Sequence, residues 1–165
     1  MSDIHEGVPR GEGGPSGEPV VERSNEHLVD IVNRLTRREM AAGAAAASAA
    51  ERLRGDDQVV VAGDIEAGHR DRAACLPALA RALSGEPSSS SNLRSLLDRA
   101  RVRRREKRGD AGILQALAGI EDELAEQYRD AIMTVGFTDN ERAILAVGLA
   151  YAESAVYRLR GVLPH

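Results

Sequence analysis

The chain has very few aromatic residues and a single cysteine. Its 165 residues include no tryptophan, one phenylalanine and three tyrosines, so a core must be built from Leu, Ile, Val and Ala. Such a core suits closely packed helices better than a β-sandwich. A lone Cys75 excludes a disulfide framework and any CxxC-type metal or redox site. Because Cys75 falls within an apolar helical pattern, we expect it to be a small buried residue.

Other absences narrow the class of protein. The N-terminus lacks the apolar segment of a secretory signal. The least polar stretch, residues 40–50, is too short and too rich in alanine to span a bilayer. We therefore expect a cytoplasmic protein. The chain has no GxSxG, HExxH or Walker pattern, which leans against an enzyme. Its formal net charge of −4 gives no overall attraction to nucleic acid.

Apolar residues recur at helical spacing over four long segments, at about 25–54, 58–83, 111–135 and 139–160. The sequence therefore predicts an all-α fold, an antiparallel four-helix bundle with one long crossover between the second and third long helices. Residues 1–21 are rich in Gly and Pro and are expected to form a disordered N-terminal tail. We expect the bundle to span 22–163, with a crossover at 84–110.

Local signals refine these elements. Pro77 removes a backbone hydrogen bond inside the second segment and predicts a kink or a restart of that helix. In the crossover, Asn92 is expected to cap a short helix. The predicted apolar face of that short helix consists of Leu93, Leu96, Leu97 and Ala100.

Polar residues interrupt the apolar stripes near the middles of the helices. Glu39, Glu66, His69 and Glu121 lie on these stripes, and Glu153 lies beside the fourth. A buried carboxylate is costly unless it is paired, protonated or bound to a metal. In di-iron and di-manganese bundles, two helices each supply one Glu and two supply Glu-x-x-His, the spacing of Glu66 and His69. These five residues are therefore candidate metal ligands, with iron or manganese as the candidate metal.

A bundle without a metal is the alternative. Val156 stands where the second histidine of that pattern belongs, so the ligand set is incomplete. Arg52, Arg70 or Arg72 could neutralise a carboxylate instead. For Tyr128, we favour packing in the core with its hydroxyl bonded to a neighbouring helix. The residues leave both a weak metal site and a purely structural bundle open.

Four stretches of the chain carry a resemblance to a known family. They are HLVDIVNRLTRRE, ALARALSGEP, GIEDELAEQYRDAI and the terminal YRLRGVL, and they lie between residues 26 and 161 or just beyond. In these the chain resembles the bacterial ferritin-like four-helix bundles of unknown function. The resemblance implies a ferritin-related fold and suggests Glu39, Glu66, His69 and Glu121 as positions that match metal ligands. The sequence departs from that pattern at Val156 and in its arginine-rich crossover.

The crossover contains a strongly basic run. Eight basic and two acidic residues lie between Arg94 and Arg108. No aromatic residue interleaves with them, so bases could not stack there and nucleic acid is a disfavoured partner. The run is either a solvated face that meets acidic residues nearby or a site for an acidic partner. The candidate contact residues for such a partner are Arg99, Arg101, Arg104, Arg105 and Arg108.

Two functional hypotheses follow. The first is a ferritin-like accessory protein with a metal- or stress-related role and a weak or degenerate metal site. The second is a structural or interaction module that presents a helical face, or the arginine-rich segment 94–108, to an acidic partner. Self-association fits either hypothesis, and neither includes a membrane.

Overall fold

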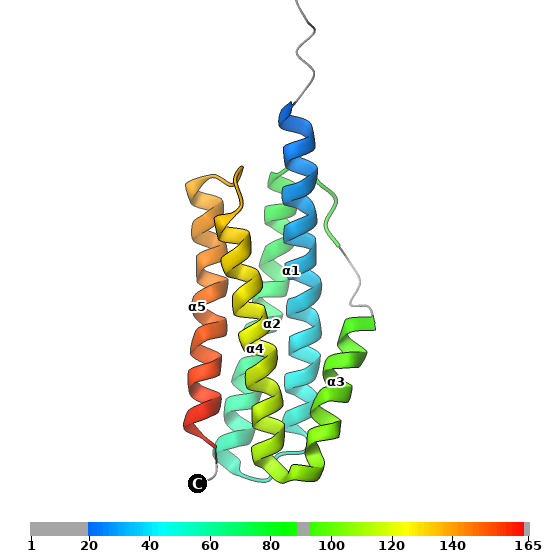
Figure 1. Cartoon of the computed structure of the whole chain (residues 1–165), viewed down its shortest axis with the longest axis vertical. Coiled ribbons are helices and arrows are strands. Elements are labelled where there is room, and N and C mark those ends of the chain that lie inside the picture. The colour runs from blue at the N-terminus through cyan, green and yellow to red at the C-terminus, as the bar shows by residue number, and fades with distance from the viewer. Residues whose placement is uncertain (1–19, 89–92, 164–165) are drawn as a thin grey trace, which may run out of the picture.

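The computed structural model describes residues 20–88 and 93–163, with side chains over 25–88 and 96–163. Figure 1 shows its helices in chain order. The predicted tail lies largely outside the described residues, and the first helix begins at Val20, five residues before the predicted start. The elements are α1 (Val20–Ala50), α2 (Asp56–Ala82), α3 (Leu93–Arg105), a 3-10 turn (Glu106–Arg108), α4 (Gly109–Met133) and α5 (Asp139–Gly161).

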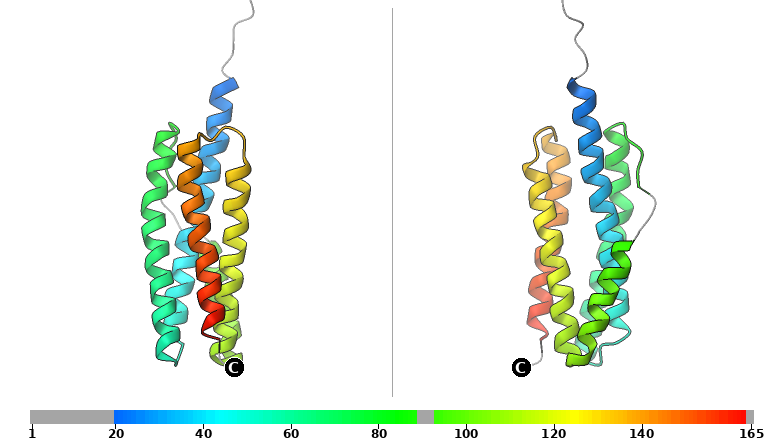
Figure 2. Two further views of the ribbon diagram at one scale, coloured as in Figure 1. Left: turned by 90° about the vertical axis from the view of Figure 1, so that its left-hand side faces the viewer. Right: turned by 45° about the vertical axis from the view of Figure 1, so that its right-hand side comes forward.

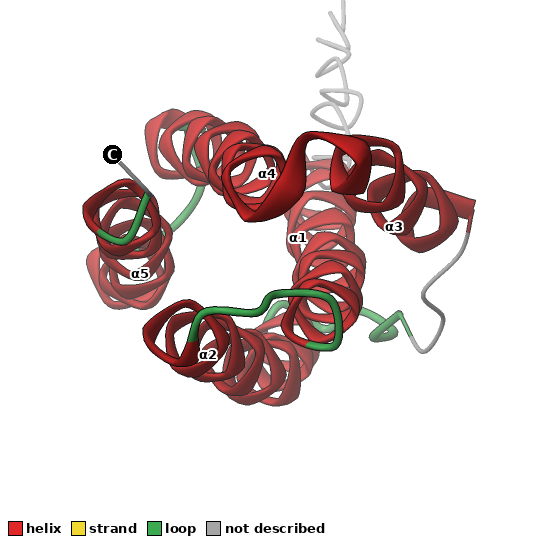
Figure 3. Ribbon diagram, turned by 90° about the horizontal axis from the view of Figure 1, so that it is seen from below, coloured by secondary structure: helices red, strands yellow, loops and turns green. Residues whose placement is uncertain are grey.

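The four long helices form the predicted all-α bundle. Helix α1 runs antiparallel to α2, and α4 runs antiparallel to α5, while α3 returns along the outside of α1 (Figures 1 and 2). Seen from below, α3 lies outside the square formed by α1, α2, α5 and α4 (Figure 3). Helices α1 and α2 pack closely, as do α4 and α5, whereas the contact between α2 and α5 is much smaller. None of the described helices is long and apolar enough to cross a membrane.

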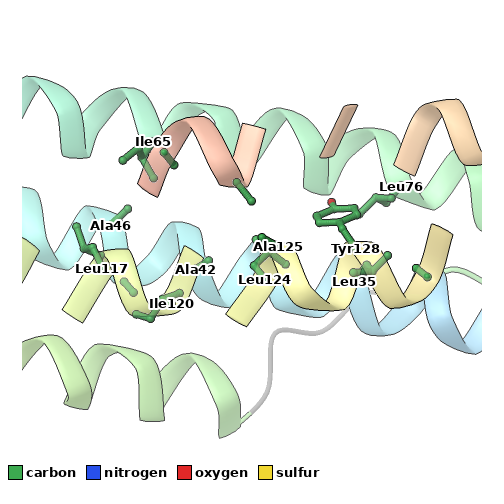
Figure 4. Close-up of a cluster of buried hydrophobic side chains, with 14 of the residues drawn as sticks. Leu35, Ala42, Ala46, Ile65, Leu76, Leu117, Ile120, Leu124, Ala125 and Tyr128 are labelled. Carbon is green, nitrogen blue, oxygen red and sulfur yellow. The ribbon is translucent and has the colours of Figure 1, made fainter. Parts of the chain in front are cut away.

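The predicted apolar stripes form the core. Figure 4 shows side chains of α1, α2 and α4 meeting in one cluster. Alanines dominate the second half of α1, where Ala42, Ala45, Ala46 and Ala49 are all buried. Alanine combines the highest helix propensity with a small side chain, so it lets α2 approach closely. One end of a stripe was predicted wrongly. Val135 was expected to end the third stripe, but it is 89% exposed because α4 stops at Met133.

The structure corrects two local predictions and excludes one alternative of a third. Pro77 does not restart the second helix, because α2 is continuous from Asp56 to Ala82. Cys75 is exposed and lines a cavity between α2 and α5. Leu96 and Leu97 are also exposed. The face of α3 that packs against the bundle contains Asp98 and Val102 instead, while Asn92 lies outside the described residues.

A buried arginine explains why Asp98 faces inward. Arg38 of α1, which is 4% exposed, donates hydrogen bonds to Asp98 of α3 at 2.6 Å and to Glu123 of α4 at 2.7 Å. One guanidinium therefore joins three helices, and two carboxylates compensate for its burial. The apolar spacing of residues 93–100 predicted the wrong face because a charged contact fixes the rotation of α3.

Helix α5 begins as predicted. Thr138 caps it, with its side-chain oxygen accepting a hydrogen bond from the backbone N–H of Glu141. The Glu141 carboxylate in turn accepts a hydrogen bond from the backbone N–H of Thr138. This reciprocal capping box satisfies two backbone donors that the first turn of a helix leaves unpaired. It fixes the start of the helix that forms one wall of the groove described below.

Candidate functional site

Three of the five predicted ligands meet in the centre of the bundle. His69 of α2 lies between the carboxylates of Glu39 on α1 and Glu121 on α4. Its Nδ1 is 2.6 Å from Glu39 Oε2, and its Nε2 is 2.7 Å from Glu121 Oε1. All three side chains are at most 1% exposed. The imidazole thus uses both ring nitrogens to connect α1 with α4 through α2.

Two further residues complete this cluster, which we call the central network. The Tyr128 hydroxyl donates a 2.6 Å hydrogen bond to Glu39 Oε1, as predicted for a core tyrosine bonded to a neighbouring helix. Arg72 Nε donates to the same oxygen at 2.8 Å. Glu39 therefore accepts three hydrogen bonds, which is why its carboxylate can be fully buried. The central network consists of Glu39, His69, Arg72, Glu121 and Tyr128.

The network holds His69 as an imidazolium. Burial alone would lower the pKa of His69, but hydrogen bonds to Glu121 and Glu39 outweigh it and raise that pKa from 6.5 to about 9. Both ring N–H groups then donate, one to each carboxylate. Arg72 Nη2 also lies 2.9 Å from His69 Nδ1. The Nδ1–H group of His69 already donates its hydrogen bond to Glu39. The short distance between Arg72 and His69 is therefore a close approach of two cations that share one carboxylate, and not a hydrogen bond between them.

The pKa values of Glu39 and Tyr128 are shifted away from the neutral range for the same electrostatic reasons. Burial tends to raise the pKa of Glu39, but the hydrogen bond from His69 and the charges of His69 and Arg72 lower it overall. Burial raises the pKa of Tyr128, and the negative charge of Glu39 raises it further. At neutral pH the network therefore contains two carboxylates, one imidazolium and one guanidinium. Its net charge is zero without any added ion.

Small residues make room for the network. A Cβ atom at Gly43 of α1 would lie 3.1 Å from His69 Cβ, and one at Gly148 of α5 would lie 2.4 Å from the Tyr128 ring. The first contact is tight and the second impossible without movement of a buried ring. Glycine at these two positions lets the helices approach His69 and Tyr128 at close range.

The other two predicted ligands lie elsewhere. Glu66 pairs with Arg70 one turn along α2, and its side chain is 31% exposed. Glu153 pairs with Arg129 of α4 at 2.7 Å and is 51% exposed. Each carboxylate has an arginine partner at the surface, so neither turns toward His69. The arginine neutralisation considered from the sequence is observed for Glu39 and Glu66, by Arg72 and Arg70.

Antiparallel long helices, one long crossover and central carboxylates define a ferritin-like four-helix bundle. The crystal structure of the DPS protein from Vibrio cholerae O1 has this fold. It matches this chain with a TM-score of 0.67 at 15% sequence identity, over 92% of this chain and all of that one. That protein is described as a member of a broad superfamily of ferritin-like diiron-carboxylate proteins. No family model matches the sequence, and no curated protein matches it significantly.

The central network does not fit a two-metal centre. His69 directs its two nitrogens at opposite carboxylates, so one ion on His69 could reach only one of Glu39 and Glu121 without rearrangement. Val156 is buried where a second imidazole would be needed. The guanidinium of Arg72 already supplies a positive charge to Glu39. Within 25–88 and 96–163, no group of three or more His, Cys, Asp or Glu side chains is arranged to hold a metal ion.

One atom of the network lacks a partner. Glu121 Oε2 is buried, and none of the described residues forms a hydrogen bond with it. A buried carboxylate oxygen in this state is normally compensated by a water molecule or an ion. Metal binding by Glu39, Glu66, His69, Glu121 and Glu153 therefore stays a prediction, restricted in practice to the three residues that meet.

The basic run lies on the outer side of α3 and on the turn after it. Arg101 is paired with Glu123 at 2.5 Å, as the solvated-face alternative predicted. The remaining cations after Val102 point to solvent, and none of them forms an ion pair with a described residue. These cations, which we call the basic face, are Arg103, Arg104, Arg105, Lys107 and Arg108.

Sequence reasoning missed a groove beside the central network. Where α2 and α5 separate, the surface opens into a cavity of about 820 Å³ that reaches Arg72 and Tyr128. Its wall on α5 includes Ile144, Val147 and Tyr151, all roughly half exposed. These three residues are spaced i, i+3 and i+7, which is a second apolar stripe beside the buried one. That spacing was the signal in the sequence from which a second apolar face of α5 could have been predicted.

Proposed function

We propose that this protein is an accessory ferritin-like bundle that acts by binding a ligand and not by chemistry at a di-metal centre. The observation that carries the proposal is the charge balance of the central network. Two cations, the buried His69 and the largely buried Arg72, face two buried carboxylates, Glu39 and Glu121. In a di-metal bundle, the metal ions would supply that positive charge.

The charge balance has a chemical consequence. A metal ion at His69 would have to displace a proton whose pKa is about 9, and it would meet the fixed charge of Arg72. Both effects weaken metal binding at neutral pH. The network instead offers structural support, because it joins α1, α2 and α4 by hydrogen bonds to charged groups.

Metal analysis of the untagged full chain tests the proposal. After equilibration with excess Fe(II) or Mn(II) and removal of free ion, we expect clearly less than one metal per chain. We also expect the melting temperature to be unchanged by a chelator, because the proposal includes no metal in the folded core. Two tightly held metals per chain, or a large loss of stability on chelation, would refute the proposal.

A weak single-metal site is the second candidate, and the unpartnered Glu121 Oε2 favours it. In this alternative, His69 Nε2, after loss of its proton, and Glu121 would hold one iron or manganese ion, which would fit a metal- or stress-related accessory role. Binding would then tighten as pH rises from 7 to 9, because the competing proton is lost. Metal titrations of the parent protein and of Glu121→Gln at both pH values decide between the candidates.

A further inference from the structure

The groove between α2 and α5 is long and reaches deep into the bundle. Its lining extends from Gly68 to Ala82 on α2 and from Thr138 to Tyr151 on α5. At 1.5 Å per residue this corresponds to a length of about 20 Å. Its floor includes the ring of Tyr128, a residue that is only 1% exposed. It is therefore a slot between helices and not a flat apolar face.

The walls of the groove are hydrocarbon over most of its length. Leu76 and Leu79 from α2 face Ile144 and Val147 from α5. The two α5 residues are 47% and 56% exposed, so the apolar surface is open to solvent. Exposed apolar area that gathers in one concave place is a typical feature of binding sites for small molecules, and about 820 Å³ lies in their usual range.

The polar groups on the floor of the groove are already in use. The Tyr128 hydroxyl and Arg72 Nε both donate to Glu39, and Arg72 lies under the ring of Tyr151 at 5.1 Å. At the opposite end, Thr138 and Glu141 bond to each other in the capping box. A ligand with polar groups along its whole length would lose its water over the middle of the groove without gaining hydrogen bonds there, because the other polar side chains, such as Asp71 and Asn140, lie near the two ends. The groove therefore suits a hydrocarbon chain.

We infer that the α2–α5 groove binds a single long-chain aliphatic molecule, such as a fatty acid or a fatty alcohol. The chain lies along Leu76, Leu79, Ile144 and Val147, and its head group lies at the Arg72–Tyr151 end. Glu39 neutralises Arg72, and Asp71 lies at the rim beside it. We therefore expect the affinity to depend strongly on the length of the aliphatic chain and only weakly on the chemistry of the head group. This inference rests on the proposed function, since it names the ligand that such a binding protein would take.

Cys75 provides a direct readout, because it is exposed, lines the groove and is the one cysteine of the chain. The rate of its reaction with a thiol reagent is measured with palmitate, with hexadecanol and with six-carbon analogues, all below their aggregation limits. We expect both 16-carbon compounds to slow the reaction at least fivefold and the short compounds to have little effect. Titration calorimetry should give one site per chain with a negative heat-capacity change.

Matched variants test the location. Val147→Asp and Tyr151→Ala change the groove, whereas Val60→Asp and Tyr157→Ala change exposed residues of the same types outside it. We expect the groove variants to weaken binding of the 16-carbon compounds at least tenfold and the outside variants to leave it unchanged. Because all four positions are exposed, the fold should persist, and circular dichroism verifies it.

The inference is overturned if neither 16-carbon compound protects Cys75, or if the groove variants bind as tightly as the outside variants. Either result leaves the proposed function standing when metal content stays clearly below one per chain. Two tight metals per chain would instead refute the proposed function, whatever the groove binds.

Discussion

Gly148 of α5 lies directly against the ring of Tyr128 on α4, so close that a Cβ atom there would be 2.4 Å from the ring. The ring cannot retreat freely, because its hydroxyl is bonded to Glu39. We therefore expect Gly148→Ala to destabilise the protein by about 1–3 kcal/mol through overpacking. Urea unfolding measures the change. Gly63→Ala in α2 is the matched control, since a Cβ there meets nothing within 4 Å, and it should be neutral or stabilising by up to about 1 kcal/mol.

Removing one charge from the central network should be far more costly than removing one from the surface. Glu39→Gln leaves His69 and Arg72 buried without their shared anion, and breaking a buried pair in this way costs about 3–5 kcal/mol. Glu66→Gln and Glu153→Gln break exposed pairs worth less than about 1 kcal/mol. Chemical denaturation of the three variants measures the difference. Equal effects would contradict the geometry of the network.

Stability should fall on the alkaline side of neutrality. The pKa of His69 is raised from 6.5 to about 9, so its contribution is complete below pH 6.5 and is lost as pH rises through about 9. That shift corresponds to on the order of 3 kcal/mol. The pKa of Glu39 is lowered from 4.5, so its contribution is present above pH 4.5 and disappears in acid. Unfolding free energies measured from acid, below pH 4.5, up to about pH 10 test both statements, with a flatter alkaline profile expected for His69→Gln.

Restoring the missing histidine should not restore a metal centre. Val156 is buried, but Glu153, its intended partner, is paired with Arg129 at the surface. We expect Val156→His to lower stability by a few kcal/mol, because it buries an imidazole, and to leave iron and manganese content unchanged. The measurement compares melting temperature and metal stoichiometry with those of the parent protein. A clear gain in bound metal would show that Glu153 can turn inward and would favour the metal alternative.

The basic face should bind polyanions without contributing to the fold. We expect the parent protein to be retained on immobilised polyphosphate, with retention falling steeply as salt rises. Replacing Arg104, Arg105 and Arg108 with Gln should abolish retention and leave the melting temperature nearly unchanged. The control carries the same charge change at Arg70, Arg129 and Arg158, which form exposed pairs elsewhere. An equal loss of retention in both variants would indicate that binding depends on the net charge of the protein and not on the basic face.

The fold was predictable because helical spacing survives almost unbroken in this chain. The first apolar stripe is buried at every position, Glu39 and Leu53 just past the end of α1 included; its other members are Leu28, Val32, Leu35, Ala42, Ala46 and Ala49. Capping also acts locally, so Thr138 and Glu141 fixed the start of α5 from sequence. The rotation of α3 was not predictable, because Arg38 sets it from 60 residues away by its bond to Asp98.

The site was predictable only in part, for a related reason. Periodicity placed Glu39, His69 and Glu121 at similar depths in the bundle, and they do meet. Periodicity could not decide whether Glu66, on a stripe, and Glu153, beside one, face inward. Each carboxylate instead pairs with an arginine, one turn away on the same helix for Glu66 and on the next helix for Glu153. The groove depends on how far α2 and α5 separate, which is a property of tertiary packing.

The clamp formed by Arg38 with Asp98 and Glu123 also affects the order in which the helices fold. Its two partners are 60 and 85 residues away along the chain, so the clamp can close only after α1 and α4 have come together. Helix α3 is very polar, and two of its leucines are exposed. It therefore buries little apolar surface that could drive it to dock before the ion pair forms. We therefore expect α3 to be the last helix to join during refolding and the first to detach in the native state. Its amide protons should exchange with solvent as one cooperative unit, faster than those of α1 and α4.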